Sequence, residues 1–296
     1  MEVHANWGSA GFDLAPTAEA TSVFPRREYL ATWWEHFGEG RLALVEGPEA
    51  LLPLWSAADG TVQFLGDEDL TDYHSPLGPN CGPLLAGYLS ELPTGTSFRF
   101  DSLPREAADA LADALAGVEP VQHEAAQRIV LPADFERFLA TRRKKERHEL
   151  RRKHRRFSES LGQPRLQEGT ADPVGVFIEL HRLSGGRKGA FMTSEREAFF
   201  RSLAALPDCR VDIVSGDGVP VAAAIGFQDD EGYYLYNSAY DPAHSAASPG
   251  MVMLWLLIER AIENRAAIFD FLKGDEAYKL RLGAEPRPLY ALTGQT

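Results

Sequence analysis

A carboxylate, a tyrosine and a lysine lie close together near the end of the 296-residue sequence, in the segment IFDFLKGDEAYK. Asp270 stands in an otherwise apolar stretch that we expect to be a strand, where a buried carboxylate is costly without a partner. Burial or a neighbouring lysine would shift its pKa, and such a carboxylate can take a proton from a substrate or bind an ammonium group. A structural ion pair of Asp270 is the alternative. Gly274 permits a tight turn, after which Tyr278 and Lys279 project from one helical turn.

A second segment, YYLYNSAYDPAHSAASPGM, has the features of an anion site. It predicts a strand, a polar loop and a helix with Pro249 in its first turn, where the missing N–H of proline costs nothing. The amides of Gly250 and Met251, together with the positive end of the helix dipole, can bind a phosphate or pyrophosphate. The alternative is that Ser248 is an ordinary helix N-cap.

Charge is distributed unevenly along the chain. The formal net charge is −13, yet residues 142–156 contain 10 Lys or Arg against 2 Glu. An acidic protein with one basic helix is unlike general nucleic-acid binders, so we expect no DNA partner. Arg152 and Arg156 fall on one face of this helix and can hold a phosphorylated or carboxylated substrate. A solvated face whose side-chain stems cover apolar surface is the alternative.

Other site types lack the residue spacing that they need. The 8 His are scattered and the 2 Cys stand far apart, so we expect neither a metal site nor a disulfide. His181, among apolar neighbours on a predicted helix, either reaches a substrate cleft or is a satisfied, half-buried histidine. The sequence contains no apolar run of membrane-spanning length and no apparent leader at its start, which predicts a cytoplasmic protein.

The hydrophobic pattern predicts an α/β (α+β) protein with two domains. Residues 28–38 form a helix, and three short apolar runs between 41 and 66 form an antiparallel meander, followed by a helix, a strand, a helix and a strand. A similar order returns after the longest predicted helix, 134–161. We therefore expect domains at 1–133 and 134–296, each a mixed, mostly antiparallel sheet flanked by helices, with the basic helix 134–161 linking them.

The element order, together with YDPAHSAASPG and DFLKGDEAYK, resembles the GNAT N-acyltransferase superfamily. Within it, the chain is similar to the FemAB-like branch that includes the CelD-type acetyltransferases of polysaccharide gene clusters. The match is good from about residue 137 to the end. The first half matches mainly in element order, so the resemblance implies tandem GNAT-like domains, with the first serving as scaffold or acceptor pocket.

The resemblance implies how a donor binds. Two central strands, 233–240 and 267–272, should splay apart so that an acyl carrier lies between them. The pantetheine arm of an acyl-CoA would pair with the backbone of Asn237, Ser238 and Ala239. The pyrophosphate would bind at the start of the following helix, at Ser248, Gly250 and Met251. The sequence HSAASPG departs from the common GNAT pattern [QR]xxGx[GA], because Pro249 removes one amide. In FemAB-like relatives that lengthen peptidoglycan cross-bridges, the donor is instead an aminoacyl-tRNA.

Roles for the reactive residues follow from the same resemblance. Asp270 would be the base or the ammonium anchor, Tyr278 the acid toward the leaving group, and Lys279 an anion contact. The substrate contacts would be His181, Arg152 and Arg156. We expect transfer of an acyl group, such as acetyl, from acyl-CoA to an amine of a cell-envelope or polysaccharide precursor, such as a nucleotide-linked amino sugar, without a metal. An aminoacyl-tRNA-dependent peptidoglycan transferase and a non-catalytic binding protein of the same fold are the alternatives.

Overall fold

The computed structural model describes residues 1–8, 10–167 and 170–296. The chain forms two compact units, one made of Met1–Ala126 and Pro286–Thr296 and the other of Gln127–Glu285. The last strand, which we expected in the second domain, therefore belongs mostly to the first unit. Among the helices in the described part of the chain, none has both the length and the hydropathy that crossing a membrane requires.

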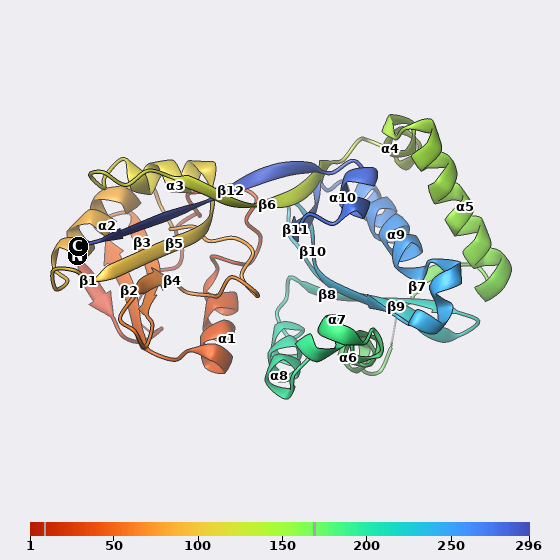
Figure 1. Ribbon diagram of the computed structural model, residues 1–296, viewed down its shortest axis with the longest axis horizontal. Helices are drawn as coiled ribbons and strands as arrows, with labels where there is room; N and C mark the ends of the chain where they lie inside the picture. Colours follow the sequence, from red (N-terminus) through yellow and green to blue (C-terminus); the bar gives the residue numbers. More distant parts are fainter. Residues whose placement is uncertain (9, 168–169) are drawn as a thin grey trace. The chain divides into compact units, whose positions relative to one another are not determined.

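The first unit is built on a sheet of strands in the order β1-β2-β3-β4-β5-β12 (Figure 1). Only the β4–β5 pair is parallel; β1–β2, β2–β3, β3–β4 and β5–β12 are antiparallel, so the predicted meander is present. The strands are β1 Glu2–His4, β2 Arg41–Gly47, β3 Ala50–Ser56, β4 Val62–Phe64, β5 Ser97–Pro104 and β12 Glu285–Gln295.

Three helices accompany this sheet: α1 Arg27–Phe37, α2 Cys81–Ser90 and α3 Arg105–Ala112. Helices α2 and α3 contribute the apolar side chains Leu85, Leu89 and Leu111 to one core with the strand residues Leu54 and Phe100. Burial of a leucine side chain contributes roughly 2 kcal/mol, so these leucines stabilise the first unit.

The second unit has a sheet in the order β11-β10-β9-β8-β7, in which only β10 and β11 are parallel. The strands are β7 Arg165–Gln167, β8 Cys209–Gly216, β9 Val219–Gln228, β10 Gly232–Tyr240 and β11 Ile268–Lys273. Strand β6, Val121–Val130, runs from the first unit into the second. Each unit is therefore a mostly antiparallel sheet flanked by helices, which confirms the predicted fold class.

Helices cover both faces of the second sheet (Figure 1). Helices α6 Pro173–Leu183, α7 Gly186–Phe191 and α8 Ser194–Leu203 lie on one face, and α9 Pro249–Glu263 packs on the other, with α5 Lys144–Leu161 outside it. A short 3₁₀ helix, η1 Pro242–Ala247, precedes α9, and α10 Ala277–Arg281 follows β11. Leu150 and Phe157 of α5 are buried in the same core as Leu257 and Ile258 of α9.

The predicted helix 134–161 is wrong in one respect, because it is two helices. Helix α4 spans Phe135–Thr141 and α5 begins at Lys144, while Arg142 and Arg143 have extended backbone. The Arg142 guanidinium lies over the Phe138 ring, 5.1 Å from its centroid, and donates a hydrogen bond to the Leu282 carbonyl. The local sequence favours helix throughout, so we attribute the break to these contacts of Arg142.

Candidate functional site

Strands β10 and β11 separate partway along their length. They pair at Gly232 with Ile268 and at Tyr233 with Phe269, and the last pair is Tyr234 with Asp270. Both strands continue beyond this pair, to Tyr240 and Lys273. On its other edge β10 stays paired with β9 as far as Tyr240. The backbone of residues 237–239 therefore has a strand partner on one side only among the described residues.

A β-bulge lies where the two strands part. The pairing of β10 with β9 shifts between Leu235 and Asn237, so Tyr236 is the extra residue. The Tyr236 ring packs toward α8, with its centroid 5.7 Å from that of Phe200, and the side chain of Asn237 lies close enough to His181 of α6 to affect the pKa of that imidazole. Successive residues of a regular strand point to opposite faces, whereas both of these face the α6–α8 layer. The bulge has thus turned Asn237 toward α6.

Asp270 is fully buried at the parting point. Its Oδ1 accepts a hydrogen bond from the Leu272 N–H at 2.7 Å, and Leu272 has a left-handed backbone with φ of 59°. Such a conformation costs about 1–3 kcal/mol for a side chain of this kind, so a contact that fixes it is needed. One carboxylate oxygen of Asp270 therefore shapes the end of β11, where the chain leaves its partner strand.

Lys279 holds the turn that follows β11. Its buried Nζ lies 3.4, 2.5 and 3.3 Å from the carbonyl oxygens of Leu272, Lys273 and Gly274, and 2.9 Å from Oε2 of Glu276. An ammonium group has three N–H donors, so these contacts use its hydrogen-bonding capacity. The structure thus brings Lys279 to the end of β11, the strand that carries Asp270, with its donors engaged by the protein.

Tyr278 is half-buried beside the same strand end. Its ring meets the Phe271 ring edge-on, with centroids 6.0 Å apart. Burial raises the pKa of Tyr278 well above its usual value, and the charge of Glu276 raises it further. The phenol therefore remains protonated at neutral pH and can donate a hydrogen bond or a proton.

The start of α9 offers fewer free amides than the sequence predicts. Ser248 has a left-handed backbone with φ of 57°, and its side chain makes no capping hydrogen bond, so it is no ordinary N-cap. The Met251 N–H already donates to the Ser248 carbonyl at 3.1 Å, and Pro249 has no N–H. The Gly250 N–H makes no hydrogen bond among the described residues. A Cβ at Gly250 would stand 3.3 Å from the Tyr240 ring, so the helix start packs against the end of β10.

The two arginines predicted to bind substrate are in different situations. Arg156 donates from Nη1 to the Ala246 carbonyl at 3.1 Å, so its exposed guanidinium lies beside η1, just before the start of α9. Arg152 forms two hydrogen bonds of 2.7 Å with Glu149 on its own helix. Only Arg156 is therefore brought to the candidate anion site at the start of α9.

His181 is buried in the α6–α8 layer. It is 1% exposed, and its ring centroid lies 5.6 Å from those of Phe177 and Phe191. Burial lowers the pKa of His181 to about 4, and the positive charge of Lys188 contributes to the same shift. The imidazole is therefore neutral at physiological pH, and its buried Nδ1 has no hydrogen-bond partner among the described residues.

The same unit contains a buried polar network that was not predicted from the sequence. The Tyr233 hydroxyl donates to Oδ2 of Asp212 at 2.8 Å, and Arg260 of α9 donates to both oxygens of Asp212. A Cβ at Gly226 would lie 2.6 Å from the hydroxyl end of Tyr233, so that side chain crosses β9 over a glycine. Tyr233 and Arg260 are 21 and 48 positions from Asp212 in the sequence, so the three residues form no motif. The one feature of the sequence that could have indicated this network is Asp212 itself, a polar residue within an apolar strand.

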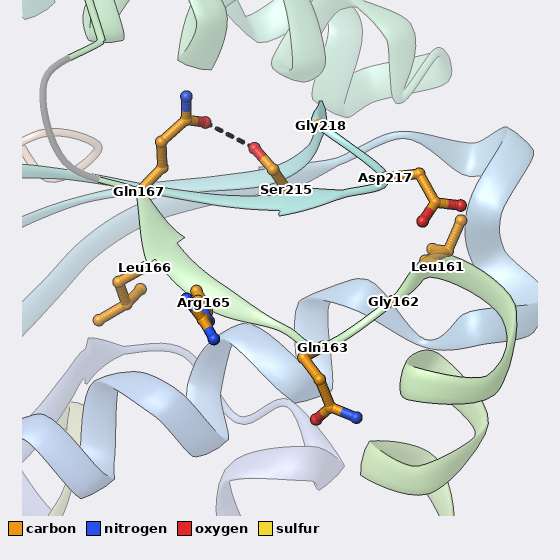
Figure 2. A pocket seen from close by; sticks show the side chains of 9 residues that line it. All are labelled: Leu161, Gly162, Gln163, Arg165, Leu166, Gln167, Ser215, Asp217 and Gly218. Atoms are coloured by element: carbon orange, nitrogen blue, oxygen red, sulfur yellow. Dashed lines mark hydrogen bonds between the residues drawn. The ribbon is translucent and has the colours of Figure 1, made fainter.

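Two other features lie away from the parting strands. A cavity of about 420 Å³ at the edge of β7 and β8 is lined by residues such as Gln167 and Ser215, and includes none of the predicted site residues (Figure 2). In the first unit, Glu68, His123 and Glu124 bring possible ligand atoms within 4.8 Å of one another. There Nε2 of His123 accepts the Ser102 N–H at 3.0 Å, so a neutral ring carries its proton on the nitrogen that faces Glu68.

Comparisons with known proteins agree with this geometry. Residues 144–280 match the model of an acetyltransferase (GNAT) domain. Similar solved structures include a conserved protein of unknown function from Bacteroides thetaiotaomicron VPI-5482 (TM-score 0.66, 13% identity, 95% of this chain and 94% of that one). A second is FemX, with a TM-score of 0.62 and 12% identity over 95% of this chain and 94% of that one. A third is L-PGS from Bacillus licheniformis, with a TM-score of 0.57 and 15% identity over 93% of each chain.

At these identities the solved structures show a shared fold, over nearly the whole length of each chain. No curated protein matches the sequence. The resemblance drawn from the sequence is confirmed for residues 144–280, which match the model of an acetyltransferase (GNAT) domain.

Proposed function

We propose that the protein is an N-acyltransferase that moves an acyl group, such as acetyl, from acyl-CoA to an amine of a cell-envelope or polysaccharide precursor. The observation that carries this proposal is the parting of β10 and β11 beyond Tyr234 and Asp270. Backbone that is paired on one side only can accept an extended, amide-containing chain as an additional strand. The pantetheine arm of CoA is such a chain, and we assign its contacts to the backbone of Asn237, Ser238 and Ala239.

The start of α9 supports the binding of the donor's phosphates. The Gly250 N–H and the positive end of the α9 dipole face an anion that approaches this helix start. Because the Met251 amide already has a partner, we assign the phosphate contact to Gly250 and to the guanidinium of Arg156 beside η1. One amide and one arginine can replace the fuller cradle that the common GNAT pattern provides.

The reaction requires two proton transfers. An amine with a pKa of roughly 10 is almost fully protonated at neutral pH and must lose a proton before it can attack. Its nitrogen then bonds to the thioester carbonyl carbon, the C–S bond breaks, and a second proton leaves the nitrogen while the departing thiolate takes one. We assign the first proton or the ammonium contact to Asp270 and the proton for the thiolate to the Tyr278 hydroxyl.

The acceptor is inferred from the positive charge of α5. We propose a small-molecule amine that carries a diphosphate, such as a nucleotide-linked amino sugar, since exposed cations of α5 favour an anionic molecule. Its contacts would include Arg152 and Lys279, although Arg152 would have to leave Glu149 and Lys279 would have to exchange a carbonyl for the ligand. Acyl-CoA and nucleotide-linked sugars are cytoplasmic metabolites, so the proposal places the reaction in the cytoplasm.

Isothermal titration with acetyl-CoA tests the donor. We expect saturable binding by the wild type, and binding within about threefold of it for Asp270→Asn, because that change leaves the backbone contacts of the donor in place. The absence of binding to folded wild-type protein would contradict an acyl-CoA donor.

A second candidate, an aminoacyl-tRNA-dependent transferase, is favoured by the exposed lysines of α5. Lys144 and Lys145 are exposed and have no ion pair among the described residues, so they are available to phosphates. Titration with charged tRNA at two salt concentrations would reveal it, since each phosphate contact lowers the logarithm of affinity by about 0.9 per tenfold rise in salt. Tight, strongly salt-dependent binding of charged tRNA without binding of acetyl-CoA would favour this candidate.

A further inference from the structure

Helix α10 carries Tyr278 and Lys279, yet little in the helix itself fixes its place. It has five residues, and its N-cap residue, Glu276, makes no side-chain capping hydrogen bond. A helix this short is not stable by itself. Lys279 ties it to the end of β11. The place of Tyr278 therefore also depends on what holds the other end of the helix.

Arg142 holds that other end. The helix is followed by Leu282, its C-cap residue, and by Gly283, whose φ of 84° ends the helix in a left-handed conformation. The last carbonyls of a helix have no partner within it. Arg142 donates from Nη1 to the Leu282 carbonyl, and the Leu282 N–H donates to the Tyr278 carbonyl at 3.0 Å. Two successive hydrogen bonds thus connect Arg142 to the backbone of Tyr278.

Arg142 fits closely against Gly283. A Cβ at position 283 would coincide with the Arg142 guanidinium, so glycine is what leaves room for it there. The guanidinium also donates from Nη2 to the Thr141 hydroxyl at 2.8 Å and lies over the Phe138 ring. Arg142 reaches this place because the chain between α4 and α5 is extended. The break in the basic segment therefore brings one arginine to the end of α10.

Packing of apolar side chains does not replace this contact. A cavity of about 550 Å³ lies beside α10, lined by residues such as Arg143 and Leu280, and Leu280 is 55% exposed. Partial burial of Arg142 also leaves its Nε without a hydrogen-bond partner in the part of the chain that the structure describes. An apolar side chain would avoid this cost, which favours a role of Arg142 in placing α10 over a role in general stability.

We propose that Arg142 is a positioning residue: its hydrogen bond to the Leu282 carbonyl fixes α10 and so holds the Tyr278 hydroxyl where it can give its proton to the departing thiolate. The proposal rests on the proposed function for its chemical consequence, because the acid role of Tyr278 is part of that function. The link between Arg142 and α10 can be tested without any substrate. Arg142 acts through α10 and does not itself touch the reacting atoms.

Two substitutions break the link by different routes. Arg142→Met keeps an unbranched side chain and deletes the donors, and its control is Arg151→Met, because Arg151 ties α5 to α4 without contacting α10 among the described residues. Gly283→Ala keeps Arg142 but places a methyl group where its guanidinium lies. Its control is Gly218→Ala, because Gly218 has nearly the same φ, 81°, with no atom within 4 Å of an added Cβ. Urea denaturation establishes that each variant is folded.

The first measurement is amide hydrogen exchange of residues 276–284, followed by mass spectrometry without any ligand. We expect the amides of Leu282 and Ala284 to exchange roughly 5- to 10-fold faster in Arg142→Met and in Gly283→Ala, the effect of losing one hydrogen bond. Exchange in the two control variants should match that of the wild type. Gly283→Ala carries the test if Arg142→Met does not fold.

The second measurement is the release of free CoA from acetyl-CoA with a nucleotide-linked amino sugar. We expect kcat to fall roughly 5- to 10-fold in Arg142→Met and Gly283→Ala, while KM for acetyl-CoA stays within about twofold, because the proposed donor contacts on β10 and α9 are unchanged. Arg142→Lys, which keeps the charge and an N–H donor, should restore part of kcat. A purely structural role would lower the urea midpoint and leave kcat of the folded protein unchanged.

Each outcome decides one part of the proposal. Unchanged exchange in folded Arg142→Met would overturn the link between Arg142 and α10. Faster exchange with unchanged kcat would overturn the positioning role, and an equal loss of kcat in Gly218→Ala would trace the effect of Gly283→Ala to backbone strain instead. If Tyr278→Phe transfers acyl groups as fast as the wild type, the acid role in the proposed function fails and its positioning fails with it, while the exchange rates still decide whether Arg142 holds α10.

Discussion

Tyr234 and Asp270 form the last residue pair that joins β10 to β11. Beyond this pair, Asp270 binds the N–H of Leu272, and the bulge at Tyr236 redirects β10. Each strand thus has a local feature just beyond its last pair that changes the direction of its backbone, the Asp270–Leu272 hydrogen bond in β11 and the bulge in β10. The separation therefore coincides with local features of the two strands themselves.

Asp270 combines a structural contact with its proposed chemical role, and two substitutions separate these. Asp270→Asn retains an oxygen that can accept the Leu272 N–H, so we expect it to fold normally and to lose at least about 100-fold in the rate of acyl transfer. Asp270→Ala loses both functions and should also be about 1–3 kcal/mol less stable, because the Leu272 N–H is left without its partner. Release of free CoA from acetyl-CoA with a nucleotide-linked amino sugar measures the rate. Full activity of Asp270→Asn would refute its role as base.

Gly226 is required where Tyr233 crosses β9. In Gly226→Ala the new methyl group would lie 2.6 Å from the Tyr233 hydroxyl and 2.7 Å from the Tyr234 carbonyl oxygen. We expect a loss of about 1–3 kcal/mol in the free energy of unfolding, because the clash displaces Tyr233 from Asp212. Urea denaturation measures it. Gly87→Ala, at a helical site with open space, is the control and should be neutral or stabilising.

Acid should destabilise the second unit through His181. The pKa of His181 is about 4 in the folded protein because of burial, below its ordinary value of 6.5. Between these two values the unfolded chain binds the proton more readily, so stability falls as the pH drops from about 6.5 to 4 and is fully present above 6.5. The loss from this group is on the order of 3 kcal/mol. Urea denaturation at several pH values should show a smaller slope for His181→Phe; identical slopes would contradict this prediction.

Arg156 should contribute to donor affinity, whereas its neighbour on α5 should not. Arg156 lies beside η1, whereas Nε of Arg155 lies 3.8 Å from Oε1 of Glu159 on the same helix. We expect Arg156→Gln to weaken acetyl-CoA binding about 3- to 10-fold, less so at high salt, because an exposed cation near a phosphate is screened. Arg155→Gln removes the same charge from the helix and serves as the control. If both substitutions weakened binding equally, the effect would come from the overall positive charge of α5, and the specific role of Arg156 would be contradicted.

The sequence predicted most of the order of elements, but not the short strand β1, the short helix α7 or the division between α4 and α5. Apolar runs with glycine and proline between them marked the strands, and DFLKG and SPGM marked the turn and the helix start. The break at Arg142 and the bulge at Tyr236 could not be predicted, because each depends on contacts with residues that are distant in the chain, Leu282 and Ile225. The link between Tyr233 and Asp212 requires knowledge of strand register for the same reason.

A crystal structure of the protein with acetyl-CoA tests the central claim most directly. We predict that the strands part beyond Tyr234 and Asp270, that the pantetheine arm bonds to the backbone of residues 237–239, and that a phosphate lies near the Gly250 N–H. Strands β10 and β11 paired along their whole length, with side chains filling the space between them, would contradict the account.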